Sequence, residues 1–149
     1  KGKTKAQVLI EHLVLKAVSI LHSEDPLYNV CFFALHTPLP IFQNIYLKIS
    51  RKGATGGHPE SLGISFIVST KNLGSILIDL KSTNGTIAAS STFEDKKAMN
   101  AVKNYLNARE DIPSFIKTME LKTGKVSKRD FFFGDIKMQP RTVSINIKV

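Results

Sequence analysis

The hydrophobic pattern predicts a helix at the start of the chain. Between Lys5 and His22, apolar residues cover most of a helical circumference and leave one narrow polar stripe, made of His12, Lys16 and Ser19. Thr4 precedes Gln7 by three positions, which is the spacing of a capping box at a helix N-terminus. We expect so apolar a helix to be buried on more than one side, against its own domain or against a partner.

Several segments that follow have patterns typical of strands. The run Val30–Leu35 is apolar throughout, which indicates burial on both faces, and Cys31 within it is expected to be a buried small side chain. Apolar and polar residues alternate over Ile45–Ile49, and apolar positions recur at every second residue over Ile64–Val68, the period of a half-buried strand. The glycine-rich stretch Arg51–Gly63 between them predicts a long exposed loop.

The dipeptide Asn84-Gly85 predicts a hairpin with a two-residue turn, because a type I′ turn needs a positive φ at both central residues. This turn fixes the cross-strand pairs Leu80–Ala89, Ile78–Ser91 and Ser82–Ile87. The apolar residues of both strands then share one face of the hairpin. Turn chemistry and hydrophobic pattern therefore support the same register.

The second half of the chain predicts another helix and two strands. An amphipathic helix is expected from Thr92 or Phe93 to Arg109, with Glu94 and Asp95 at its positive end. A strand follows at Ile116–Leu121. Beyond Gly124 we expect a basic turn, three core aromatic residues at Phe131–Phe133 and a final strand at Val143–Val149.

These elements predict an α+β fold. We expect a mostly antiparallel or mixed β-sheet with a β-hairpin followed by one amphipathic helix, and an N-terminal helix packed on the sheet. The length of 149 residues fits a single domain, 1–149. Its parts are the N-terminal helix (1–25), a sheet-plus-helix core (30–123) and a basic turn with a C-terminal strand (124–149). Because the chain opens with Lys1 instead of Met, we interpret it as a fragment of a longer chain.

Charge and composition exclude some classes of protein. A single cysteine excludes an internal disulfide framework, and no apolar run reaches the roughly 20 residues of a membrane span, so no membrane insertion is expected. The net charge of +9 permits contact with nucleic acid or an acidic partner. A basic surface is expected where positive residues are densest, at Lys117, Lys122, Lys125, Lys128 and Arg129. No interleaved aromatic residues accompany it, which favours a solvated surface over a nucleic-acid site.

Catalytic and metal-binding patterns are incomplete in this sequence. Gly2-Lys3-Thr4 lacks the upstream glycine and strand of a phosphate-binding loop, and Asp79 lies in the predicted hairpin instead of at the end of a parallel strand. The four histidines are scattered and no GxSxG elbow occurs. We therefore expect no catalytic residues, no metal site and no cofactor, and predict that the chain is not an enzyme.

The order of elements around the hairpin resembles a known family. Residues 38–121 contain a strand, a Leu73-Gly74 step, the alternating strand Ile76-Ile78-Leu80, a glycine turn, a second strand, a helix and a further strand. This order resembles the C-terminal domain of flagellar hook-length control proteins. In that family a Leu-Gly step opens the β-strand of the region that switches export specificity. The proline that often precedes this step in the family is replaced here by Ser69-Thr70-Lys71-Asn72.

The resemblance implies a non-enzymatic protein-binding module. Its partner would be a protein of the flagellar type III export gate, which it would switch from hook to filament subunits. Leu73 and Gly74 would mark the switch segment, with Ile76 and Ile78 structural within it. The implied location is the cytoplasm, with export through the flagellar apparatus as an option. Two alternatives remain: a basic nucleic-acid-binding α+β domain, and an assembly or scaffold domain whose apolar first helix docks on a partner.

Overall fold

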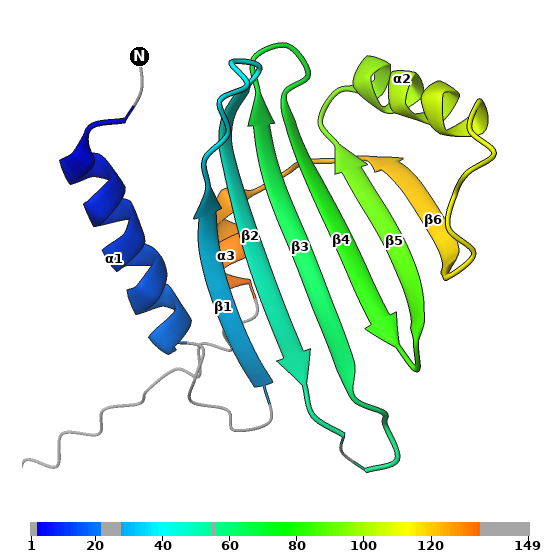
Figure 1. The fold of residues 1–149 in the computed structure, drawn as a ribbon, viewed down its shortest axis with the longest axis horizontal. Coiled ribbons are helices and arrows are strands. Elements are labelled where there is room, and N and C mark those ends of the chain that lie inside the picture. The colour runs from blue at the N-terminus through cyan, green and yellow to red at the C-terminus, as the bar shows by residue number, and fades with distance from the viewer. Residues whose placement is uncertain (1–2, 22–27, 55, 135–149) are drawn as a thin grey trace, which may run out of the picture.

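The computed structural model describes residues 3–21, 28–54 and 56–134. They form an α+β fold with one six-stranded mixed sheet and three helices (Figure 1). The elements are α1 (Lys5–Leu21), β1 (Tyr28–Leu35), β2 (Phe42–Lys52), β3 (Ser61–Thr70), β4 (Ser75–Thr83), β5 (Thr86–Phe93), α2 (Lys96–Asn107), β6 (Ile116–Thr123) and α3 (Lys128–Phe133). The strands follow one another across the sheet in chain order. All neighbours are antiparallel except β5 and β6, which are parallel and connected through α2.

The capping box predicted for α1 is present. The backbone N–H of Gln7 donates to Thr4 Oγ1 at 3.2 Å, and the backbone N–H of Thr4 donates to Gln7 Oε1 at 2.9 Å. These two bonds satisfy donors that a helix N-terminus otherwise leaves open. The predicted helix is confirmed as far as Leu21, and its predicted end at residues 23–26 lies outside the described residues.

The predicted hairpin register is also confirmed. Asn84 and Gly85 have φ values of 52° and 75°, and β4 pairs with β5 through the three expected pairs. The loop predicted at Arg51–Gly63 is shorter than expected, because Arg51 pairs with Leu62 and Lys52 pairs with Ser61, which extends both strands into the predicted loop. The glycine-rich composition of the segment marked the turn but did not show where strand pairing stops.

The start of α2 differs from the prediction. Thr92 and Phe93 are the last residues of β5, and the helix is capped by Asp95, whose side chain accepts a hydrogen bond from Lys97 N at 2.7 Å. Glu94 lies outside the helix and accepts from Ser75 N at 2.9 Å. The strand continues because Thr92 and Phe93 are buried on opposite faces of the sheet, a tertiary effect that outweighs the local helix signal.

A short third helix was not predicted. Ser127 caps α3 by accepting from Asp130 N at 3.2 Å, and Phe131–Phe133 form its second half. Phe131 is buried as expected and packs edge-on against Phe32 of β1, with ring centroids 6.0 Å apart. The predicted final strand at 143–149 lies outside the described residues.

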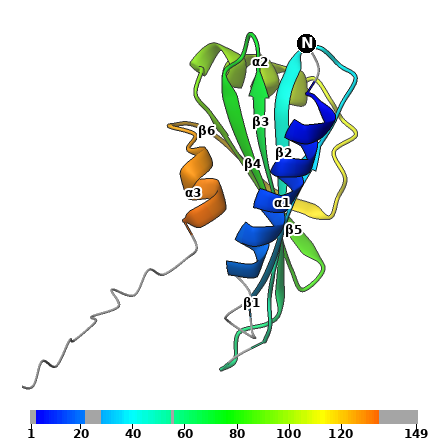
Figure 2. The ribbon, with the colours of Figure 1, turned by 90° about the vertical axis from the view of Figure 1, so that its left-hand side faces the viewer.

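The core of buried side chains lies on the side of the sheet that carries α3, which we call the back face (Figure 2). Its buried members are Leu15, Val18, Val30, Phe32, Ile67, Val126 and Phe131. Helix α1 runs along β1 at the edge of the sheet, where the Phe32 N–H donates to Ser19 Oγ at 3.2 Å. This bond occupies part of a strand edge that would otherwise be free to pair.

Predictions of burial are wrong for β1, for α1 and for Phe133, which was expected in the core but is 41% exposed. β1 is an edge strand with only its back face covered, so Val30 and Phe32 are buried while Cys31 is exposed. Helix α1 is buried on one side only, through Leu15 and Val18. Its outer stripe of Leu9, Ile10, Leu13 and Val14 is 55–61% exposed. An apolar run therefore did not distinguish a strand buried on both faces from one that leaves an apolar face open.

Candidate functional site

The face of the sheet opposite α3, which we call the front face, carries a grid of apolar side chains over β1–β4. Strand pairing places them in three rows, one residue per strand: Leu35, Ile45, Val68 and Ile76; Phe33, Leu47, Phe66 and Ile78; Cys31, Ile49, Ile64 and Leu80. The grid arises because every second residue of each strand is apolar and the antiparallel register keeps these residues on one side.

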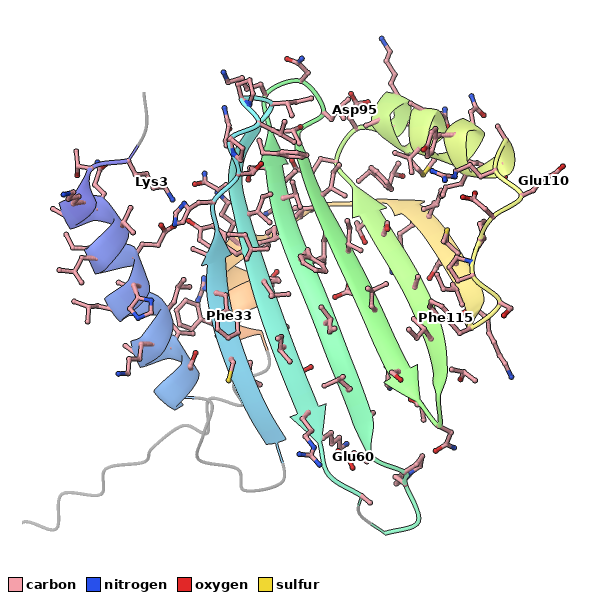
Figure 3. The ribbon with its side chains drawn as sticks, in the orientation of Figure 1. Lys3, Phe33, Glu60, Asp95, Glu110 and Phe115 are labelled. Carbon is pink, nitrogen blue, oxygen red and sulfur yellow. The ribbon has the colours of Figure 1, made fainter. Side chains whose placement is uncertain are left out.

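The front face over β1–β4 is not covered by any element of the described chain. Helix α2 packs mainly on β5 and β6, where Phe93 and Ala89 are buried. Figure 3 shows side chains standing on β2, β3 and β4 with no helix over them. Phe33 is 46% exposed, and no member of the three rows is buried, whereas Ile67 on the back face is 1% exposed.

The predicted switch segment lies partly in this surface. Ile76 and Ile78 belong to β4 and stand in the first and second rows of the front face. Leu73 and Gly74 lie in the β3–β4 turn immediately before β4. The structure therefore brings Ile76 and Ile78 into a surface that also includes β1, β2 and β3, with the Leu-Gly step at its end.

The β3–β4 turn is fixed by hydrogen bonds of Thr70. Its hydroxyl accepts from Leu73 N at 2.9 Å and donates to the carbonyl oxygen of Gly74 at 3.0 Å. Gly74 has a φ of +68°, a conformation that residues with a Cβ rarely adopt, and a Cβ there would lie 3.3 Å from Glu94 Oε2. The backbone conformation of the turn thus favours glycine, and a Cβ at this position would also make a tight contact with the Glu94 side chain.

The residues predicted to form a basic surface are exposed but distributed over several elements. Lys117 and Lys122 lie on β6, Lys125 lies in the β6–α3 connection, and Lys128 and Arg129 begin α3. The connection crosses behind the sheet from one side to the other, so these residues follow a long path (Figure 1). Lys128 lies over the Tyr46 ring, with its Nζ 6.0 Å from the centroid.

A polar cluster joins α1 to β2 next to a cleft of about 450 Å³ between α1 and α3. Glu11 Oε1 accepts from the Tyr46 hydroxyl and from Lys3 Nζ, each at 2.7 Å. Burial raises the pKa of Glu11, but the hydrogen bonds from Lys3 and Tyr46 outweigh it and leave this pKa below its ordinary value. Burial and then the bond to Glu11 raise the pKa of Tyr46 to about 12. Each polar group of the cluster already has a partner within the chain.

Asp79 has a structural partner that accounts for its position. It stands in the middle of β4 on the back face and accepts a hydrogen bond from Ser65 Oγ at 2.6 Å. Within residues 3–21, 28–54 and 56–134, no three His, Cys, Asp or Glu side chains converge as a metal site would require. In the same part of the chain, no helix has both the length and the apolar character to cross a membrane.

Comparisons with known proteins identified no relative of this chain. No family model, curated protein or solved structure matches this chain. The front face is therefore the most distinctive feature of the described residues, and its interpretation depends on its own chemistry.

Sequence reasoning recognised the alternation of apolar residues but took the apolar side as core. The members it missed as surface are Cys31, Phe33 and Leu35 on β1, Ile45, Leu47 and Ile49 on β2, and Ile64, Phe66 and Val68 on β3. One signal could have found them. Tyr46, Ile67 and Leu77 occupy the opposite positions of the same strands and form a second apolar row, so one sheet has two faces to cover.

Proposed function

We propose that this chain is a non-enzymatic protein-binding module and that its partner binds the front face. The observation that supports the proposal is the contiguous apolar grid over β1–β4, which no described helix covers. Contiguous apolar surfaces of this kind mark sites where another macromolecule binds. Because burying a large apolar side chain is worth about 1.5–3 kcal/mol in full, covering several exposed or partly buried ones contributes free energy toward association.

We propose more specifically that the module binds the flagellar type III export gate and switches the specificity of export. This proposal is supported by the resemblance of residues 38–121 and by the position of Ile76 and Ile78, which belong both to the switch segment and to the front face. Leu73 and Gly74 then shape the turn that sets where β4 begins. In this role the module acts through binding, and the export gate protein is the partner.

The test is the length of flagellar hooks in cells in which this gene is disrupted, measured by electron microscopy. We expect overlong hooks without filaments, restored by the wild-type gene and by Leu13→Gln in the outer stripe of α1. The double variant Ile64→Thr and Ile78→Thr, which makes two front-face positions polar, is expected not to restore them. Hooks of normal length in the disrupted cells would overturn the export-switch role.

A second candidate function is supported by the outer stripe of α1. Leu9, Ile10, Leu13 and Val14 are exposed on a helix whose other side is already packed, which favours an assembly or scaffold domain that docks through α1. Leu13→Gln separates the two candidates, because it should abolish assembly through α1 but leave binding at the front face intact.

The nucleic-acid alternative predicts affinity that falls steeply with salt, which a titration with duplex and single-stranded oligonucleotides would detect.

A further inference from the structure

The border of the front face carries positive charges that have no ion-pair partner in the described part of the chain. Three of these lysines belong to α2, which packs on the same side of the sheet at β5 and β6, and the fourth lies in the β3–β4 turn. They are Lys71, Lys96, Lys97 and Lys103, and all are exposed. Helix α2 itself contains no acidic residue between Lys96 and Asn107.

Most acidic groups near this border already accept a hydrogen bond or form an ion pair. Asp95 caps α2, Glu94 accepts from Ser75 N, and Asp111 pairs with Arg109 at 2.5 Å. Hydrogen bonds from backbone N–H groups leave Glu94 and Asp95 charged, so these two and the exposed Glu110 offset three of the four lysine charges, while Arg109 and Asp111 cancel each other. An arriving partner meets an apolar surface whose border keeps a small net positive charge and four lysines without an ion-pair partner.

The size of the apolar grid suits one helix. Strands about 4.8 Å apart give a width of roughly 14 Å from β1 to β4, and a helix with its side chains is about 10–12 Å across. Three rows about 7 Å apart extend roughly 14 Å along the strands, which matches two to three helical turns. Helix α2 shows that this face accepts a helix, since it packs on β5 and β6 through an apolar stripe that includes Ala98, Val102 and Leu106.

We propose that the front face binds an amphipathic helix of a partner protein whose apolar stripe is flanked by acidic residues. This inference rests on the proposed protein-binding function and specifies the chemistry of the partner. The apolar stripe covers the grid, and the acidic flanks meet the lysines of α2 and of the β3–β4 turn. A second copy of this chain is a poorer occupant, because each copy carries a net charge of +9.

The test is a display library of helical peptides of about 18 residues, each with leucine at i, i+3, i+4 and i+7 and either Glu or Lys at every flanking position. The full chain selects from this library, and sequencing gives the ratio of Glu to Lys in the recovered peptides. A library with the same composition but scrambled leucine positions measures attraction by charge alone. We expect about fivefold enrichment of Glu in the first library and little recovery from the second.

Two matched sets of variants locate the effect. Replacing Lys71, Lys96, Lys97 and Lys103 by Gln should bring the ratio of Glu to Lys close to one. Replacing Lys5, Lys16, Lys122 and Lys125 by Gln removes the same charge elsewhere and should leave the enrichment unchanged. The Ile64→Thr and Ile78→Thr double variant should lose recovery of all peptides, provided that its circular dichroism spectrum and melting temperature match a folded chain.

Several results would overturn the inference. They are no recovery of peptides by the wild type, equal recovery of Glu and Lys, an equal response to both lysine sets, or recovery that the front-face variant does not change. A dimer that sedimentation shows to depend on Ile64 and Ile78 would also overturn it in favour of a second copy. If peptides bind the front face without acidic preference, only this inference fails, whereas normal hooks in disrupted cells would leave the peptide result standing and refute the export role.

Discussion

At the scale of single residues, Tyr46 links stability to alkaline pH. Its pKa is raised to about 12 by burial and by its hydrogen bond to Glu11, while in the unfolded chain it is near 10. A raised folded pKa means that the stabilisation is complete below pH 10 and is lost as pH rises from 10 to 12. We expect Tyr46→Phe to lower the free energy of unfolding by about 1 kcal/mol at pH 8, and by progressively less toward pH 12.

Urea denaturation at pH 8, 10 and 11.5 measures this difference, and ultraviolet titration follows the tyrosinate directly. Glu11→Gln is the companion variant, since it removes the carboxylate that holds the hydroxyl proton. It should lower the pKa of Tyr46. A late tyrosinate step that persists in Tyr46→Phe would contradict the assignment.

Gly74 has two separate roles to test. The family resemblance places it in the switch segment, and its positive φ makes it important for the conformation of the β3–β4 turn. Its φ of +68° and the 3.3 Å approach to Glu94 Oε2 predict that Gly74→Ala lowers the free energy of unfolding by about 1–2 kcal/mol. Gly85→Ala is the matched control, because Gly85 has a φ of +75° and open space where its Cβ would lie. An excess loss for Gly74→Ala over Gly85→Ala, measured by chemical denaturation, reports the contact with Glu94. Equal losses would assign the whole effect to the backbone.

At the scale of elements, the parts that the sequence predicts well are those with local causes. The capping box at Thr4 and Gln7 and the turn at Asn84-Gly85 each need only neighbouring residues, and both occur as predicted. The start of α2 was misplaced because burial of Thr92 and Phe93 in the sheet extends β5. Helix α3 was missed because the three phenylalanines of its second half suit a strand or a short helix equally well until their packing on Phe32 is known.

The observed start of α2 predicts the effect of changing its cap. Asp95→Ala should lower the free energy of unfolding by about 1 kcal/mol, because Lys97 N then loses the acceptor 2.7 Å away. Asp95→Asn keeps an acceptor of the same shape and should retain most of the stability. Thermal and urea denaturation of Asp95→Ala and Asp95→Asn measure this difference in stability. If both variants are as stable as the wild type, the helix is not capped at Asp95.

At the scale of the whole molecule, the sequence predicts the α+β class and the register of the β4–β5 hairpin better than it predicts which face is the core. Both faces of β2, β3 and β4 carry apolar residues, but in the described chain the helices α1 and α3 cover the back face and α2 covers only the end of the front face. Coverage depends on where distant helices pack, and no periodicity within a strand contains that information. The sequence consequently shows the alternating apolar residues of the front face but does not show that no helix covers them.

The unequal coverage of the two faces predicts opposite results for the same substitution on one strand. Ile67 and Ile64 both belong to β3, but Ile67 is 1% exposed on the back face while Ile64 is only partly buried on the front face. Ile67→Thr places a hydroxyl in the core and removes buried apolar volume, so we expect a loss of about 2–4 kcal/mol in the free energy of unfolding. Ile64→Thr should cost less than about 1 kcal/mol and should reduce binding of a hydrophobic dye to the folded chain. Urea denaturation and dye fluorescence measure the two effects, and an equally large loss for Ile64→Thr would mean that the front face is covered within the chain itself.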